Sequence, residues 1–281
     1  DRGHKLEPFI RDMVVDKLRD QGLDVELLTS NARYIDPEFP FLRCEVDFEL
    51  LVRGSTVIGS QIVEFKGEHI NADAKRCIEA GVPHISVDTK KKELVGNFKN
   101  GGREWQREGE PELVDVHDFP DDAVGKAIPY GVYDVVDNSA FVAVGIDHDT
   151  AAFAVASIET WWKRMGSNRY PGAREIHISA DAGGSNANRS RLWKTELQRL
   201  ADKLGISFHV SHYPPGTSKW NKIEHRLFSF ITMNWRGRPL RTFEAVVNLI
   251  GATTTSGGLV VRAAIDKRKY PTGIAISDAE M

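Results

Sequence analysis

A short strand–helix–strand unit constrains the fold of this chain more than any other feature of its sequence. Residues 175–180 and 206–211 alternate apolar and polar side chains as strands do, and residues 188–204 between them carry an apolar stripe at helical spacing. Such a unit returns in the same direction by a right-handed crossover, so the two strands are expected in one parallel arrangement. The sequence therefore predicts an α/β fold.

The surrounding patterns extend this unit into a larger sheet. They predict a strand at 84–88, a polar insertion or long loop at 94–137, two strands at 140–146 and 151–158 joined as a hairpin, a short helix at 160–165, and a helix at 219–235. The order strand, hairpin, helix, strand, helix, strand, helix is the layout of a ribonuclease-H-like mixed sheet with flanking helices. We expect this domain to span residues 68–281.

Residues 1–67 have a different character and are expected to form a small α/β segment. A helical pattern covers 6–18, and strand-like runs at 44–52 and 56–65 flank the turn at 53–55. A helix and a β-hairpin are therefore predicted before the main domain.

The composition of the 281-residue chain excludes some classes of protein. Cys44 and Cys77 lack the close spacing of zinc ligands or of a disulfide framework, and they suit a reducing cytoplasm. No apolar run is long enough for a membrane span and no leader pattern is present, so no membrane partner is expected. The chain begins at Asp1, so the missing leader carries little weight.

Three acids stand where catalysis is expected. Asp88 and Asp181 each end a predicted strand, and ligand sites in open α/β sheets lie beyond the carboxyl ends of strands. Glu224 lies on the predicted helix between Trp220 and Phe228, where a carboxylate needs a cation or a partner. Oxygen ligands favour magnesium, and two such ions about 4 Å apart can drive phosphodiester chemistry. The spacing alone is weak support, because the chain has 40 acidic residues.

Basic residues cluster near these acids although the net charge is −3. Cations beside catalytic carboxylates offset the repulsion of an approaching phosphate backbone. The residues expected to contact DNA are Lys90, Lys91, Lys92, Lys219, Asn221, Lys222 and Arg226. For Asn221, a supporting contact to metal or phosphate and a plain position on the helix surface both stay open. His209, His212 and His225 lie near the site in sequence, and for His225 contact to DNA and a structural role both stay open.

Three longer motifs surround these acids: VDTKKKE with GNFKN at 87–100, SADAGGSN at 179–186, and HYPPGTSKWNKIEHR at 212–226. They resemble the motifs of ISAzo-type insertion-sequence transposases of the DDE superfamily, from about residue 68 onward. The resemblance implies a ribonuclease-H-like fold, Mg²⁺ or Mn²⁺ as cofactor, and hydrolytic nicking at transposon ends with strand transfer to target DNA. It implies a bacterial, cytoplasmic, nucleoid-associated enzyme, and leaves a homo-oligomer open.

The front of the chain is similar to phage-type exonucleases of the PD-(D/E)xK class. Asp47 and Glu64 on adjacent strands could share a metal, Lys66 could polarise water, and Glu7 would be a fourth contributor. An exposed cross-strand face explains the same residues without a site. A natural fusion, an insertion into a nuclease gene and a joining artefact all stay open. So do two other functions for the whole chain: a nuclease with a transposase passenger, and an inactive DNA-binding remnant.

Overall fold

The computed structural model describes residues 24–35, 43–53, 67–116, 123–214, 216–217 and 220–277. The chain divides into two compact units, Asp1–Ile62 and Val63–Met281. The division lies close to residue 67, where the sequence changes character.

The first unit contains one antiparallel strand pair, β1 (Asp24–Ile35) and β2 (Arg43–Arg53), with a register shift between Leu27 and Thr29. The strand predicted at 44–52 is confirmed as β2. Its partner among the described residues is β1, which the sequence did not predict, whereas the predicted partner at 56–65 and the predicted helix at 6–18 lie outside the described residues.

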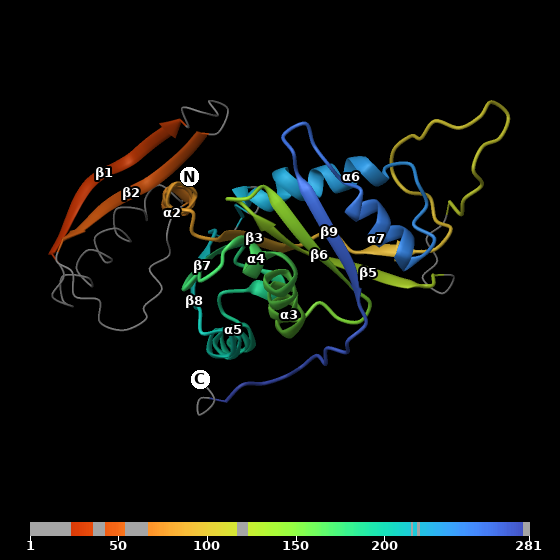
Figure 1. Ribbon diagram of the computed structural model, residues 1–281. Coiled ribbons are helices and arrows are strands. Elements are labelled where there is room, and N and C mark those ends of the chain that lie inside the picture. Colours follow the sequence, from red (N-terminus) through yellow and green to blue (C-terminus); the bar gives the residue numbers. More distant parts are fainter. Residues whose placement is uncertain are drawn as a thin grey trace. The chain divides into compact units, whose positions relative to one another are not determined.

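The second unit is built on a large mixed sheet (Figure 1). Its strands are β3 (His84–Thr89), β4 (Glu93–Val95), β5 (Gly125–Asp134), β6 (Ser139–Gly145), β7 (Glu175–Ala180), β8 (Ser207–His212) and β9 (Val260–Asp266). Its helical segments are α2 (Gly67–Ala80), α3 (Ala151–Trp161), η2 (Trp162–Gly166), α4 (Ser167–Arg169), η3 (Gly184–Asn186), α5 (Arg191–Leu204), η5 (Glu224–Phe228), α6 (Ser229–Trp235) and α7 (Phe243–Gly251).

The strand pairing has the predicted ribonuclease-H-like layout. The order in the sheet is β8-β7-β3-β5-β6-β9, and β4 pairs with β5. β3, β5 and β6 form an antiparallel meander, and β7 and β8 continue from β3 in parallel. β9 adds in parallel to β6. The α/β prediction from the 175–211 unit is confirmed, because β7, α5 and β8 form that parallel crossover.

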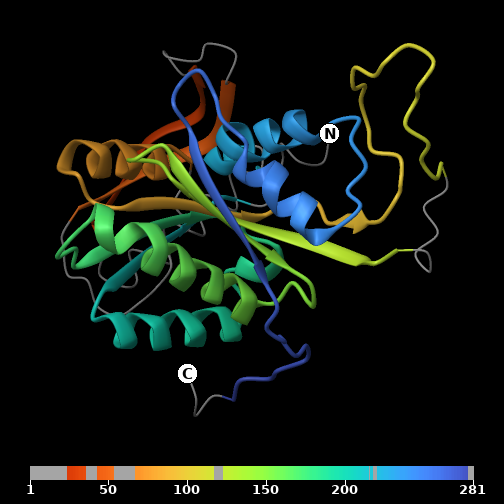
Figure 2. The ribbon, with the colours of Figure 1, turned by 45° about the vertical axis from the view of Figure 1, so that its right-hand side comes forward.

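Helices cover both faces of the sheet (Figure 2). α3 and α5 pack their buried Phe153, Trp161 and Trp193 against one face. η5, α6 and α7 pack against the other, with Leu227 and Val246 among the buried side chains. Side chains alternate along each strand, so a strand between two helix layers contributes to both cores. None of the helices in the described part of the chain is long and apolar enough to cross a lipid bilayer.

Two sequence predictions around this sheet were wrong. Residues 151–158 form the helix α3 and not a strand, and the strand β5 lies inside the stretch predicted as a loop at 94–137. The run 151–158 is apolar on every side, so periodicity cannot separate a buried helix from a buried strand. Thr150 is the residue that indicates a helix here. Its side chain caps α3 by accepting a hydrogen bond from the Phe153 N–H, as threonines before a helix do.

Candidate active site

Asp88 and Asp181 lie at the same edge of the sheet. β3 and β7 are parallel neighbours, and Val87 is in register with Ala180. The residues that follow this pair are Asp88 and Asp181, so the two carboxylates leave adjacent strands at one level. The Asp88 carboxylate accepts a hydrogen bond of 2.7 Å from the Thr89 N–H, which fixes it at the strand end.

Glu224 is brought to the same edge by the helix that crosses the sheet. Gly131 on β5 is in register with Asp88, and a Cβ at Gly131 would lie 2.7 Å from both Ile223 Cδ1 and Phe228 Cε1. Glycine at this position therefore lets the helix approach the strand that carries Asp88. Glu224 begins the π-helical turn η5, a distortion frequent at functional sites.

The carboxyl groups of the three acids act on one another. Burial, reinforced by the negative charges of Asp181, Glu224 and Asp149, raises the pKa of Asp88 to about 8. Burial also raises the pKa of Asp181. The pKa of Glu224 is raised by burial and by Asp181, against the opposing effect of the Lys90 ammonium. Acids far apart in the sequence thus share one electrostatic environment.

Asp149 is a fourth acid at this edge, and sequence reasoning missed it. Its carboxylate accepts a 3.1 Å hydrogen bond from Thr89 Oγ1 and lies 3.2 Å from the Lys92 ammonium. Residues 147–150 were expected to be a hairpin loop, and they are instead the connection into α3. An acid directly before a helix cap was the available signal.

Asn186 orients the second acid. Its Nδ2 donates to Asp181 Oδ1 over 3.1 Å, while its Oδ1 accepts from the buried Tyr130 hydroxyl over 3.1 Å. His212 Nε2 lies 2.8 Å from the Asn186 carbonyl oxygen, which gives this histidine a structural contact. The second motif of the sequence therefore carries both an acid and the amide that positions it.

Residues 63–281 match the family model described as "Rhodopirellula transposase DDE domain". The chain belongs to this transposase family. No curated protein matches the chain at a significant level.

Solved transposases and integrases are the structural neighbours of this DDE domain. The Mos1 transposase paired-end complex with left transposon end has 12% sequence identity and a TM-score of 0.44, with 84% of this chain and 60% of that chain covered. The HTLV-2 integrase catalytic core domain in complex with magnesium has 10% identity and a TM-score of 0.35, covering 64% and 94%. The chain spans about three fifths of the Mos1 transposase. The family assignment rests on the family match.

Two of the residues predicted to contact DNA are inside the domain. Asn221 is fully buried, and its side chain bonds to Ser86 Oγ and to the Val87 carbonyl oxygen. Lys90 is 7% exposed and lies 4.5 Å above the Trp235 ring and 3.5 Å from Glu93. Both predictions of direct DNA contact, and the surface alternative for Asn221, are corrected by this burial.

The other predicted DNA contacts differ in position. Lys91, Lys92, Arg226 and His225 are exposed, and Lys222 is half-buried with its ammonium 3.0 Å from Asn71 Oδ1. Lys219 lies outside the described residues, as do Glu7, Glu64 and Lys66 of the nuclease-like set. Asp47 of that set lies on β2, and its side chain is not described.

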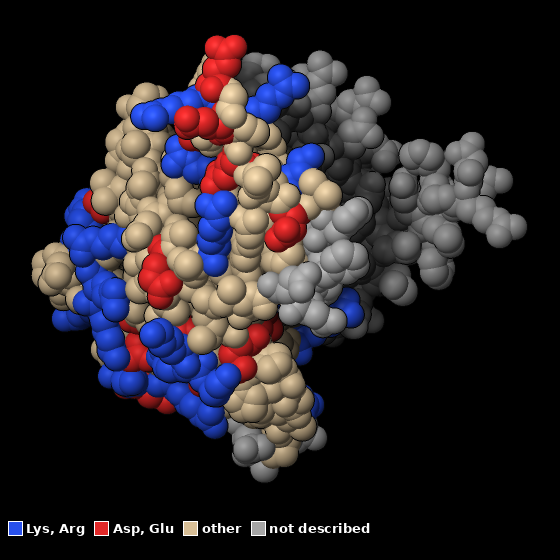
Figure 3. Space-filling view, turned by 90° about the vertical axis from the view of Figure 1, so that its right-hand side faces the viewer, with Lys and Arg blue, Asp and Glu red and all other residues tan. Residues whose placement is uncertain are grey.

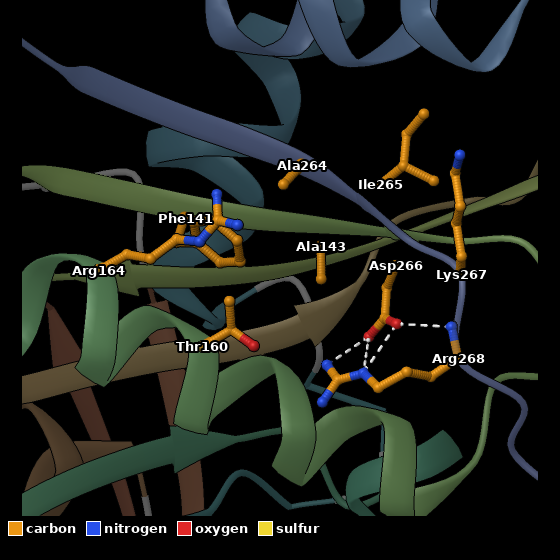
Figure 4. A pocket seen from close by; sticks show the side chains of 9 residues that line it. All are labelled: Phe141, Ala143, Thr160, Arg164, Ala264, Ile265, Asp266, Lys267 and Arg268. Carbon is orange, nitrogen blue, oxygen red and sulfur yellow. Dashed lines mark hydrogen bonds and ion pairs between the residues drawn. The ribbon is translucent and has the colours of Figure 1, made fainter.

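The charge and shape of the surface give further context. On the face in Figure 3, Lys and Arg gather toward one side with acids between them. A pocket of about 510 Å³ lies elsewhere, between α3 and the strands β6 and β9 (Figure 4). Its Arg268 guanidinium is hydrogen-bonded to Asp266, and Arg164 lines it from η2. None of the four acids of the candidate site lines this pocket.

Proposed function

We propose that this domain is the catalytic core of a DNA transposase, with Asp88, Asp181 and Glu224 as its catalytic acids. It would hydrolyse phosphodiester bonds at transposon ends and transfer the freed strand to target DNA. The observation that carries the proposal is the register of β3 and β7, which brings Asp88 and Asp181 out of adjacent strands at one level. Glu224 is close enough for its charge to contribute to the raised pKa of Asp88.

The residues present fit hard divalent cations. The donors at the site are carboxylate oxygens, which Mg²⁺ and Mn²⁺ prefer. Burial and the neighbouring negative charges raise the pKa of Asp88, and a bound dication would oppose both effects by favouring the ionised carboxylate. When bound, such ions polarise the phosphodiester and help the attacking hydroxyl lose its proton.

We propose two ions, held by Asp88, Asp181 and Glu224. Among the described residues, two groups of three ligand atoms lie within 4.8 Å of one another, and the three acids form neither group. The number of ions is therefore a part of the proposal that calorimetry tests.

The chain's own residues hold this arrangement. Thr89 N–H fixes Asp88, Asn186 fixes Asp181, and Lys90 lies where its charge favours an ionised Glu224. The exposed Lys91, Lys92 and Arg226 would bind phosphates of the DNA, with Lys219 and Lys222 beside them in sequence. We extend the proposal to a bacterial, nucleoid-associated enzyme that works as a homo-oligomer on paired transposon ends.

Manganese-dependent nicking of supercoiled DNA tests the function. We expect the parent chain to nick, Asp181→Ala to lose at least a hundredfold in rate, and Glu224→Gln to lose activity and one bound ion by calorimetry. Asp202→Ala is the matched control, because Asp202 is an exposed acid on α5.

Lys66→Ala separates the transposase from the nuclease alternative. If nicking survives Asp181→Ala and disappears in Lys66→Ala, the activity belongs to the front of the chain and the proposal fails. A parent chain without nicking would support the inactive remnant.

A further inference from the structure

A second cluster of metal-ligand side chains lies at the other end of the same strands. His84 begins β3, and Asp88 follows four residues later, about 13 Å along the strand. His84 is in register with His177 on β7, and His177 is in register with His209 on β8. Three histidines thus form a row across three parallel strands, away from the carboxylates of the candidate active site.

The helix α2 adds two ligands to this row. Asp73 and Cys77 are one helical turn apart, so both can face the sheet. The ligand atoms of Asp73, Cys77 and His177 all lie within 4.8 Å of one another. The Cys77 side chain is fully buried, and the Asp73 side chain is 25% exposed.

His84 is the observation that calls for a ligand. Its side chain is 1% exposed, and both ring nitrogens are buried without a hydrogen-bond partner among the described residues. Nδ1 lies 3.6 Å from Asp73 Oδ2, too far for a hydrogen bond. Buried polar groups are nearly always satisfied, so an orphaned imidazole beside the Asp73 carboxylate and stacked on His177 suits a cation.

We propose that Asp73, Cys77, His84 and His177 form a structural zinc(II) site. Nitrogen, sulfur and oxygen donors in this mixture suit Zn²⁺, whereas Mg²⁺ takes oxygen ligands. Ligand atoms around a tetrahedral zinc lie about 3.3–3.8 Å apart, from bond lengths of about 2.0–2.3 Å. Asp73 Oδ2 lies 2.8 Å from His177 Nδ1 and 3.6 Å from His84 Nδ1. His84 is outside the group whose ligand atoms all lie within 4.8 Å of one another, so its ring would have to move inward to complete the tetrahedron.

The hydrogen bonds of Asp73 leave room for this role. Its Oδ1 accepts from the Arg76 guanidinium over 2.9 Å, and its Oδ2 is the oxygen that faces the two histidines. Arg76 covers the exposed side of the cluster, because the same nitrogen lies 3.8 Å from Cys77 Sγ and 3.1 Å from His177 Nε2. Its side chain is 53% exposed, so a bound ion would displace the guanidinium toward solvent. The ion would tie α2 to the starts of β3 and β7, where the second unit begins.

Sequence analysis predicted no zinc site, because the two cysteines lack the spacing of a zinc motif. The four ligands come from one helix and two strands that only the fold brings together. A competing group of Glu175, His177 and His209 shares one histidine, but its His209 side chain is 52% exposed.

Cobalt(II) titration of the full, metal-free chain under reducing conditions tests the site. We expect one tetrahedral Co²⁺ per chain with a thiolate-to-cobalt absorption band, displaced by Zn²⁺ and unaffected by excess Mg²⁺. Cys77→Ser should lose the band, and Asp73→Asn and His84→Gln should each weaken binding about tenfold or more. The matched controls Cys44→Ser and His209→Gln should bind as the parent does.

Protein stability gives a second measurement in case the buried variants fold poorly. Zn²⁺ should raise the Tm of the parent and of Cys44→Ser, and should leave that of Asp73→Asn, whose side chain is partly exposed, nearly unchanged. A parent chain without a thiolate–cobalt band would overturn the proposal. So would a Cys77→Ser variant that binds Co²⁺ as the parent does, or a band lost only in His209→Gln.

Discussion

Replacing Asn221 with alanine should separate the Glu224 helix from the strand that carries Asp88. Asn221 is fully buried, and its amide nitrogen donates to the Val87 carbonyl oxygen over 3.2 Å. Its amide oxygen accepts from Ser86 Oγ, and that hydroxyl in turn accepts from the Ile223 N–H over 3.1 Å. One side chain therefore links both residues before Asp88 to the first turn of the Glu224 helix.

The loss in the free energy of unfolding follows from the buried groups that lose hydrogen-bond partners. Asn221→Ala removes the acceptor of the buried Ser86 hydroxyl proton and one donor to the buried Val87 carbonyl oxygen. Each buried polar group that loses its partner costs about 1–3 kcal/mol. We expect the free energy of unfolding to fall by about 2–4 kcal/mol, read from urea unfolding as a midpoint lower by about 1–2 M. A Ser86→Ala partner variant should show coupling of about 1 kcal/mol or more in a double-mutant cycle.

Activity should fall beyond what stability explains. A displacement of about 1 Å at a catalytic group can cost about a hundredfold in rate, so nicking by folded Asn221→Ala should drop at least tenfold. Asn234→Ala is the matched control, because Asn234 makes one bond to the Leu249 carbonyl near the far end of the same helix. The reasoning is refuted if Asn221→Ala costs less than about 0.5 kcal/mol, or if both variants lose the same activity.

Three further predictions use other parts of the domain. Gly131→Ala puts a Cβ 2.7 Å from Ile223 and Phe228, so the free energy of unfolding should fall by about 1–3 kcal/mol and nicking should become slower. Gly251→Ala is the control, because open space surrounds that position and neither quantity should change. Burial raises the pKa of Asp134 to about 6, above its unfolded value. The folded state is therefore most stable, as far as Asp134 is concerned, below about pH 4, and its free energy of unfolding falls as the pH rises to about 6 and the buried carboxyl ionises. Asp134→Asn should gain about 2–3 kcal/mol relative to the parent between these pH values in urea titrations, and an unchanged difference would contradict the assignment. Asp149→Asn removes a negative charge that acts on Asp88, so calorimetry should show a Mn²⁺ affinity lower by a few-fold. Asp181→Ala should lose nearly all Mn²⁺ binding. If the two variants lose the same affinity, Asp149 is itself a metal ligand.

The strand ends could be predicted because the information there is local. Asp88 and Asp181 each follow a short apolar run, and parallel strands place their carboxyl ends at one edge. The position of Glu224 could be predicted from the apolar stripe of its helix and from the motif at 212–226. Asp149 and Asn186 could not be found in this way, since their roles come from contacts with Thr89 and Tyr130, far away in the sequence.

Burial was the quantity that sequence reasoning judged worst. Lys90 and Asn221 looked like surface residues because lysine and asparagine usually are. The buried Lys90 ammonium is satisfied by the Trp235 ring and the Glu93 carboxylate. The buried Asn221 amide is satisfied by Ser86 and Val87. Each of these partners is distant in sequence or invisible to periodicity.

Two lysines of the run after Asp88 act on acids of the candidate site. Lys92 lies 3.2 Å from Asp149, and the Lys90 charge acts on Glu224, so two of the three lysines offset carboxylates of the candidate site. Without these cations, acids gathered at one edge would repel one another and an approaching phosphate backbone. A net charge of −3 is therefore compatible with a DNA substrate, because the compensation needed by the site is local and lies within four residues of its first aspartate.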